Sequence, residues 1–426
     1  MKTERYIRAL AVKGASVAAL FACQVLLARS SENQEEFGYY NYVISVLNLV
    51  SFLCIWGVDK YLVREVSIAH DADDRTRAWR EIYRANRVTL QNVAIFALPL
   101  SAFFFLLRPD RIDWPGMAPI VLLLLATAIA RTSGGAARGL HRVVFTEGAL
   151  NVGRPVLLIA AVGASAFFYG KIPAETLLYL TAGSFFAANL LLRHTNLRAF
   201  RPAERPSPAP LRPIYSECFP YLLVGVGLPL LTNLDVIILG TIGTDADVAL
   251  YAACARVINL AIIGLVSVNL LIAPKLPILF QQRRKAEIHA LLRKNNAVVA
   301  LVTVIPIVIL LTLGGSILGA FGPEYKVGTK VLWILLIGQV VNVFVGPVNL
   351  ICMMAREQRL ASILILVACA LEAGLCYFLI PDHGAIGAAW ANAFALSFLN
   401  LSLAGVVIAR LHVNPTLTNL LSRAKG

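Results

Sequence analysis

Two long apolar segments joined by a short acidic connector occupy residues 220–277, PYLLVGVGLPLLTNLDVIILGTIGTDADVALYAACARVINLAIIGLVSVNLLIAPKLP. The connector is TIGTDAD, residues 241–247. The first segment contains Asp235 and the second contains Arg256, each within a run that is otherwise apolar. A charged side chain at the centre of a bilayer costs roughly 2.5–3.5 kcal/mol on insertion scales, so such a residue usually has a function. We therefore expect the rest of the chain to form a membrane-embedded frame around these two residues.

The composition of the whole chain is that of a membrane protein. Of its 426 residues 58% are hydrophobic and only 15% are charged, and the mean hydropathy is +0.73. A helix needs about 20 apolar residues to span a bilayer, and the apolar segments of this chain number about twelve. The sequence predicts an all-α polytopic membrane protein, and its segments leave no length for a large soluble domain.

The distribution of basic residues predicts the orientation. Of the 38 lysines and arginines, 30 fall in the termini and loops of one side, six fall in the loops of the other side, and two lie within segments. By the positive-inside rule both termini are cytoplasmic. The same distribution explains the net charge of +14 as a topology signal and not as a nucleic-acid surface. The seven cysteines show no metal-ligand spacing, so we expect neither a metal nor a cofactor.

The order of segments predicts two halves. A connector rich in proline and arginine, residues 196–216, separates an N-terminal lobe of six helices, 1–195, from a C-terminal lobe of six, 217–426. Glu36-Phe37-Gly38-Tyr39-Tyr40 opens the second segment and Asp247-Val248-Ala249-Leu250-Tyr251 opens the eighth, which suggests a parallel internal repeat.

The local sequence of two basic stretches predicts their secondary structure. Residues 78–88 are amphipathic and predict a short surface helix. Residues 131–142 are rich in glycine and basic, and they predict a loop that follows the fourth segment.

The order and spacing of several short motifs resemble one known family. They are Phe37-Gly38-Tyr39-Tyr40 with Gly57-Val58-Asp59, Asn233-Leu234-Asp235 with Gly240, Tyr251-Ala252-Ala253 with Arg256, Phe321-Gly322-Pro323-Glu324-Tyr325, and Gly384-Ala385-Ile386-Gly387-Ala388-Ala389-Trp390. In this order they resemble the polysaccharide flippases of the multidrug/oligosaccharidyl-lipid/polysaccharide (MOP) exporter superfamily, and most closely the O-antigen or exopolysaccharide (Wzx-type) branch. The resemblance covers nearly the whole chain and is stronger in the second half.

The resemblance implies a V-shaped bundle of two six-helix lobes, like that of the multidrug and toxin extrusion (MATE) transporters, around a polar cavity. The implied cargo is an oligosaccharide linked to a polyprenyl pyrophosphate, turned across the bacterial inner membrane for O-antigen, lipopolysaccharide or exopolysaccharide synthesis. Membrane lipids and a polysaccharide polymerase are the other implied partners. Helices 1, 2, 7 and 8 line such cavities, which assigns eight residues to the substrate cavity here: Lys13, Asn41, Ser45, Asn48, Asn233, Asp235, Arg256 and Asn259.

The charged members of this set each allow two interpretations. Asp235 and Arg256 lie at similar depths, so they either form a structural ion pair or leave Arg256 to hold a pyrophosphate, for which a guanidinium is well suited. Lys13 either reaches the interface or binds the pyrophosphate at the inner entrance. Glu372, near mid-membrane, is either a neutral hydrogen-bonded acid or, together with Asp235, an ion-coupling residue. The asparagine and serine stripes suit helix–helix contacts and a sugar path equally.

No motif of an enzyme is present. The sequence contains neither G-x-x-x-x-G-K-[ST], nor G-x-S-x-G, nor H-E-x-x-H, and the loops predicted to be periplasmic are all short. The sequence therefore predicts a flippase that works by alternating access and is not an enzyme. The alternatives are a cation-coupled multidrug exporter of the same superfamily and a scaffold of polysaccharide assembly that transports nothing.

Overall fold

The computed structural model describes residues 2–111, 115–200, 212–272, 275–282, 284–355 and 357–420. Its contacts divide the chain into two compact units, Met1–Asn233 and Leu234–Gly426. The described residues are almost entirely helical, with one isolated β-bridge between Ser31 and Ile172. Part of the predicted linker, residues 201–211, lies outside the described residues, and the predicted lobes 1–195 and 217–426 stay a prediction.

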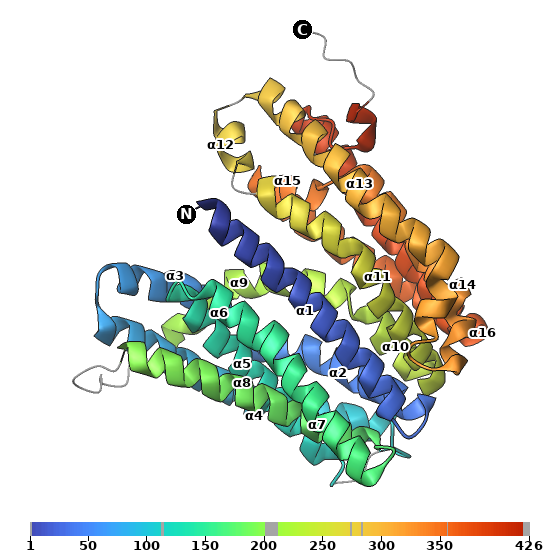
Figure 1. Cartoon of the computed structure of the whole chain (residues 1–426). Coiled ribbons are helices and arrows are strands. Elements are labelled where there is room, and N and C mark those ends of the chain that lie inside the picture. Colours follow the sequence, from blue (N-terminus) through green and yellow to red (C-terminus); the bar gives the residue numbers. More distant parts are fainter. Residues whose placement is uncertain are drawn as a thin grey trace. The chain divides into compact units, whose positions relative to one another are not determined.

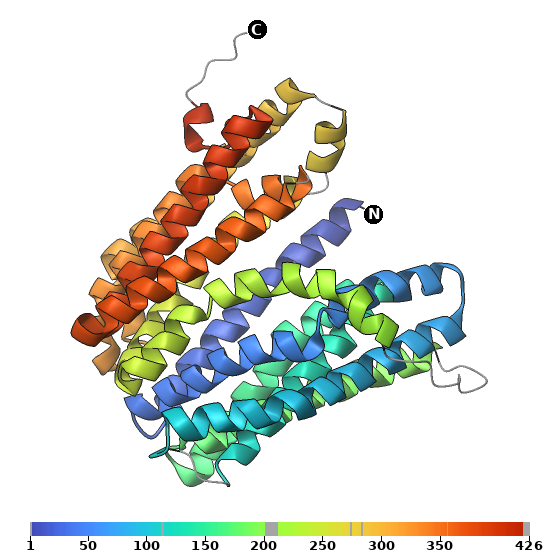
Figure 2. The ribbon, with the colours of Figure 1, turned by 180° about the vertical axis from the view of Figure 1, so that it is seen from behind.

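The described residues of the first unit form ten helical elements, whose arrangement is shown in Figures 1 and 2. They are α1 (Lys2–Ser30), α2 (Gln34–Ile55), α3 (Val58–Asp71), α4 (Arg75–Leu107), α5 (Met117–Gly139), α6 (Val143–Gly148), η1 (Ala149–Gly153), α7 (Arg154–Tyr169), α8 (Ala174–Phe200) and α9 (Arg212–Leu231). Helices α2 and α5 are mostly buried, whereas α4 and α7 expose most of their apolar side chains. Phe167 on α7, for example, is 84% exposed, as expected for a side chain that faces lipid.

The part of the second unit that the structure describes forms ten further elements. They are α10 (Leu234–Ile242), α11 (Asp245–Ile272), α12 (Leu276–Gln281), α13 (Lys285–Leu318), η2 (Pro323–Gly328), α14 (Thr329–Val345), α15 (Val348–Met354), α16 (Gln358–Val406), η3 (Val407–Leu411) and η4 (Leu417–Leu420). Helix α11 packs against α13, and α14 packs against α16. Helix α16 is not straight: Gly384 has φ 51° and ψ −129°, so two consecutive helices meet there at a kink.

The fold confirms an all-α protein with many apolar helices. Nine stretches of the described chain are long and apolar enough to cross a membrane, or ten if the end of α9 and α10 form one broken span. One of the nine, Gln358–Leu411, contains both helices of α16. The chain is therefore a multi-pass membrane protein. The number twelve and the cytoplasmic termini stay predictions.

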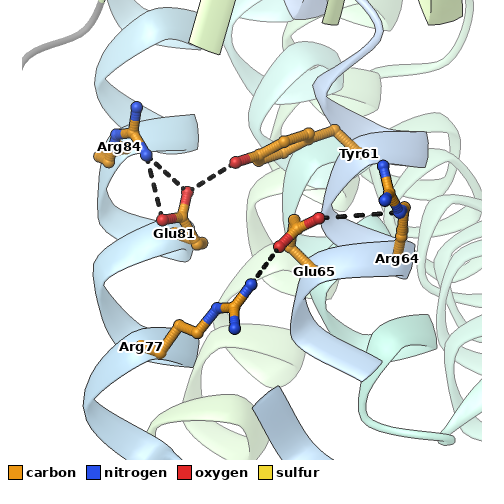
Figure 3. A network of polar contacts seen from close by, with 6 residues as sticks. All are labelled: Tyr61, Arg64, Glu65, Arg77, Glu81 and Arg84. Carbon is orange, nitrogen blue, oxygen red and sulfur yellow. Dashed lines mark hydrogen bonds and ion pairs between the residues drawn. The ribbon is translucent and has the colours of Figure 1, made fainter. Parts of the chain in front are cut away.

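Helix α3 is an amphipathic helix held to the first turns of α4 by a polar network (Figure 3). Tyr61 Oη donates to Glu81 Oε2 at 2.9 Å, and Arg84 Nη1 donates to both Glu81 oxygens at 3.0 Å. Arg77 Nη2 donates to Glu65 Oε2 at 2.9 Å. Burial, together with the negative charge of Glu81, raises the pKa of Tyr61 above its usual range, so its hydroxyl stays a donor.

The separate surface helix predicted for residues 78–88 is wrong. These residues belong to α4, which continues without interruption from Arg75 to Leu107. No proline or glycine occurs before Pro99 to end the helix, and the contacts with α3 satisfy polar groups in its first turns. The amphipathic helix beside the spans is α3, which precedes that stretch.

The loop predicted from Arg131 to Arg142 is also wrong for most of its length, because α5 continues to Gly139. Arg131 lies inside this helix, with its guanidinium 4.0 Å from the centroid of the Phe52 ring and its Nη2 atom 3.3 Å from Asn48 Oδ1. The glycines do not end the helix because they allow close packing. A Cβ atom at Gly135 would lie 2.5–3.1 Å from backbone atoms of Asp59 on α3.

One contact between a carboxylate and a backbone amide recurs in both units and supports the predicted repeat. In the first unit the Glu36 carboxylate accepts a hydrogen bond from the Ala174 amide at 2.7 Å. In the second unit the Asp247 carboxylate accepts one from the Ala385 amide at 3.2 Å. Residues 36 and 247, and residues 174 and 385, are each 211 positions apart. The acidic residue at the start of one helix thus holds the start of a later helix in both units.

Candidate functional site

A buried polar cluster lies within the second unit, on three helices that are otherwise apolar. Asp235 on α10 is 4% exposed, Tyr251 on α11 is 1% exposed and Glu372 on α16 is 0% exposed. Asn392, after the kink of α16, is half-buried between them. Buried ionisable groups in membrane-spanning helices are costly and usually mark ion or substrate pathways, so this cluster is the candidate functional site.

One amide joins the two carboxyl groups of the cluster. Asn392 Nδ2 donates to Asp235 Oδ2 at 3.1 Å and to Glu372 Oε1 at 2.9 Å. Tyr251 Oη also donates to Asp235 Oδ2, and the Val236 amide donates to Asp235 Oδ1 at 2.7 Å. Among the described residues Glu372 Oε2 has no hydrogen-bond partner. Asp235 is therefore well supplied with donors, whereas half of the Glu372 carboxyl group is not.

This unequal supply of donors decides what the cluster can do. A buried carboxylate without enough donors is strongly unfavourable, because it loses its hydration and gains little in return. A proton or a monovalent cation at Glu372 Oε2 would remove that cost. Because Asn392 Nδ2 donates to both carboxyl groups, a change of charge at Glu372 would also alter the hydrogen bond to Asp235. The described residues contain no group of three or more His, Cys, Asp or Glu that could hold a metal ion. The arrangement suits reversible binding of one small cation.

Local sequence places Asp235 at the start of its helix. Helix α9 ends at Leu231 and α10 begins at Leu234, so the backbone between them is not continuous α-helix. The Asn233 side chain donates to the Pro229 carbonyl at 2.7 Å, within the end of α9. Asp235 then lies in the first turn of α10, where free backbone amides favour an acidic side chain.

The structure separates Asp235 from Arg256, which the sequence allowed to pair. Within the described part of the chain, the contacts of Asp235 are those with Tyr251, Asn392 and the Val236 amide. No ion pair joins it to Arg256, which is half-buried further along α11. The structural ion pair between α10 and α11 is therefore not formed, because neutral donors take its place at the aspartate.

The predicted cavity residues of the first unit have mixed surroundings. Lys13 on α1 is exposed. Asn41 and Ser45 on α2 are buried, and Asn41 Nδ2 donates to the Phe37 carbonyl of its own helix at 2.8 Å. Asn48 accepts from Arg131 on α5 at 3.3 Å, which is a contact between helices. For Asn48 the structure thus shows the helix-to-helix contact that the polar stripe allowed.

The remaining predicted cavity residues are accessible. Asn233 and Arg256 are half-exposed, and Asn259 on α11 is exposed. Whether the eight residues of the two units line one cavity stays a prediction.

Sequence reasoning missed Tyr251 and Asn392 as members of the site. The sequence places Tyr251 in one of the family motifs and at the start of a segment, where it matches Tyr40, but gives it no role in the site. The comparison of the two units supplies the missing signal, because Tyr40 Oη bonds Thr181 Oγ1 at 3.0 Å, and 181 and 392 are again 211 positions apart. In the second unit Tyr251 Oη and Asn392 Nδ2 both donate to Asp235 Oδ2, so the equivalent tyrosine and polar residue meet at this carboxylate.

The first unit lacks the acids of the site. The residue 211 positions before Asp235 is Gln24, whose Oε1 atom is buried and has no hydrogen-bond partner in the described residues. The residue 211 positions before Glu372 is Ala161. Both acids are therefore specific to the second unit.

Comparison with known proteins gives a family and a fold. The family described as "Polysaccharide biosynthesis protein" matches residues 21–282, which is more than half of the chain. No curated protein sequence matches the chain.

Solved structures match nearly the full length of the chain at low sequence identity. An inward-facing multidrug resistance MATE family transporter of the MOP superfamily is similar with a TM-score of 0.75 and 13% identity, over 97% of this chain and 99% of that one. The lipid II flippase MurJ has a TM-score of 0.68 and 12% identity, over 97% and 89%. A MOP superfamily transporter from Pyrococcus furiosus has a TM-score of 0.65 and 13% identity, over 98% and 96%. At these identities the likeness concerns the fold.

Proposed function

Because the chain belongs to the polysaccharide biosynthesis protein family and has the fold of MOP superfamily transporters, we propose that it is a flippase for lipid-linked oligosaccharides. It would turn an oligosaccharide carried on a polyprenyl pyrophosphate across the bacterial inner membrane, for O-antigen, lipopolysaccharide or exopolysaccharide synthesis, and hand it to a polymerase. The polyprenyl tail would stay in lipid while the polar head group crosses. The MurJ likeness supports a fold that is able to flip a lipid.

The observation that carries the transport proposal is the pair of carboxyl groups buried in the second unit. The Asp235 and Glu372 side chains are 4% and 0% exposed, and Asn392 donates a hydrogen bond to each. A scaffold that transports nothing would not require such a buried pair of carboxyl groups. Such groups are expensive in a membrane and are typical of coupled transporters. We propose that Glu372 binds the coupling proton or cation, and that Asn392 and Asp235 respond to it.

Flipping of a labelled cargo by the purified protein tests the function. Vesicles that contain the full chain and a fluorescent polyprenyl-pyrophosphate oligosaccharide should expose that lipid to an impermeant quencher beyond the half already in the outer leaflet. Protein-free vesicles and vesicles with an unrelated polytopic protein are the controls. Equal quenching in all three preparations would contradict the flippase and favour the scaffold.

A multidrug exporter of the same fold is the second candidate, supported by the likeness to the MATE transporter. Cells that overproduce the chain distinguish the two functions. We expect no added resistance to cationic dyes if the cargo is lipid-linked, whereas dye resistance together with no lipid flipping would assign the chain to drug export.

Arg256 gives the second test of the cargo. It is half-exposed on α11, and its guanidinium is a group well suited to bind a pyrophosphate. We expect Arg256→Ala to reduce flipping about 10- to 100-fold, as for the loss of hydrogen bonds to a charged group, at normal protein level and melting temperature. Arg359→Ala, which removes an exposed arginine from α16, is the matched control. A drop in protein level with Arg256→Ala would instead indicate a structural role.

A further inference from the structure

A hollow of about 600 Å³ lies at one end of the second unit, beside α12 and the first turns of α13. Both elements are at the same end of the unit in Figures 1 and 2, and they pack against each other. The walls of the hollow include Lys275, Ile278, Arg284, Glu287 and Lys294. None of these residues belongs to the carboxyl cluster or to the predicted substrate cavity.

The hollow has an excess of positive charge. Arg284 Nε and Glu287 Oε1 form an ion pair at 3.0 Å. Lys275 and Lys294 are exposed, and neither has an ion-pair partner in the described chain. Three cations and one acid thus line the hollow, and two of the cations are not neutralised by the protein.

The other wall of the hollow is apolar. Ile278 on α12 is 54% exposed, and Leu279 and Leu291 are half-buried beside it. The N-cap residue of α13, Arg284, makes no side-chain hydrogen bond to the helix amides. Helix α13 contains one of the longest apolar stretches of the chain, so its first turns lie where the span meets water. The hollow therefore combines lysines, the N-terminal end of a helix and an apolar wall at the membrane interface.

We propose that this hollow binds the headgroup of an anionic phospholipid from the leaflet that the charge distribution predicts to be cytoplasmic. Lys275 and Lys294 would contact the phosphate, and Ile278 would contact the first part of an acyl chain. Basic pockets at the cytoplasmic ends of membrane helices suit such headgroups, because each lysine gains from the nearby phosphate. A soluble anion would need the lysines but not the exposed isoleucine. The inference does not depend on the proposed function.

Native mass spectrometry of the full chain in a neutral detergent tests the proposal, with phosphatidylglycerol as the added lipid. We expect the double variant Lys275→Gln, Lys294→Gln to bind phosphatidylglycerol about 30-fold more weakly. The variant Lys326→Gln, Lys330→Gln removes two exposed lysines from η2 and α14 and is the matched control, which should bind as the natural chain does. Lys275→Arg with Lys294→Arg should retain binding. The lipid-free melting temperature of each variant identifies a loss of fold.

Three results would overturn the proposal. Equal binding of zwitterionic phosphatidylcholine would show that charge does not select the ligand. Displacement of the lipid by inorganic pyrophosphate at millimolar concentration would assign the hollow to a soluble anion. Displacement by an equal amount of a polyprenyl-pyrophosphate oligosaccharide would assign it to the cargo.

Discussion

Replacing Glu372 with glutamine should abolish the response of transport to an ion gradient while leaving the fold intact. If one proton is coupled to each cycle, a gradient of one pH unit supports an accumulation ratio of about ten. With Glu372→Gln the ratio should fall to about one, because an amide cannot exchange a proton or neutralise a cation. Measuring the labelled lipid in both leaflets, with and without the gradient, gives the ratio directly.

The fold should tolerate this change because glutamine retains the Asn392 contact. The glutamine Oε1 atom can accept from Asn392 Nδ2, which now lies 2.9 Å from Glu372 Oε1. Its new amide group lies where Glu372 Oε2 has no partner among the described residues, so an unpaired donor costs about 1–3 kcal/mol. Glu175→Gln, at an exposed position of α8, is the control. A full gradient response in Glu372→Gln would remove Glu372 from the coupling mechanism.

Replacing Gly57 with alanine should destabilise the first unit by about 2–4 kcal/mol, because it combines backbone strain with a steric clash. Gly57 has φ +76°, a left-handed conformation that an alanine adopts only at a cost. Its Cβ would also lie 2.6 Å from the Leu222 amide nitrogen and 2.8 Å from the Cys218 carbonyl oxygen of α9. These are backbone atoms, so no side chain can rotate to make room.

The melting temperature of the purified protein measures this effect, which we expect to be a decrease of several degrees. Gly163→Ala is the matched control, because Gly163 lies inside α7 with no atom within 4 Å of an added Cβ. That change should be neutral or slightly stabilising. If both variants melt at the temperature of the natural chain, the close contact between Gly57 and α9 does not contribute to stability.

The two acids of the site were predictable because the free-energy cost of placing a charged side chain in a bilayer singles them out. Asp235 and Glu372 are charged residues inside apolar segments, and any bilayer imposes a penalty there. Asn392 was not predictable in this role. It reaches Glu372 only because α16 kinks at Gly384 and brings residues of its two helices together. A contact that depends on a backbone angle leaves no trace in composition or periodicity.

Glycines and basic residues misled the sequence prediction at α5. A run that contains Gly134, Gly135 and Arg131 is typical of a loop, yet here α5 is helical through Gly139. The glycines are used for close packing against α3, and Arg131 is accommodated by Phe52 and Asn48. Such partners come from other helices, so only the tertiary structure shows them.

The paired contacts of Glu36 with Ala174 and of Asp247 with Ala385 have a consequence for biogenesis. In both units 138 residues separate the carboxylate from the amide that it holds. At a translation rate of roughly 5–20 residues per second, the ribosome needs about 7–28 s to make the second partner after the first. During that interval the Glu36 or Asp247 carboxylate lacks the hydrogen bond from its later amide partner. The contact that fixes the start of the last helix in each half thus cannot form until that helix has been synthesised.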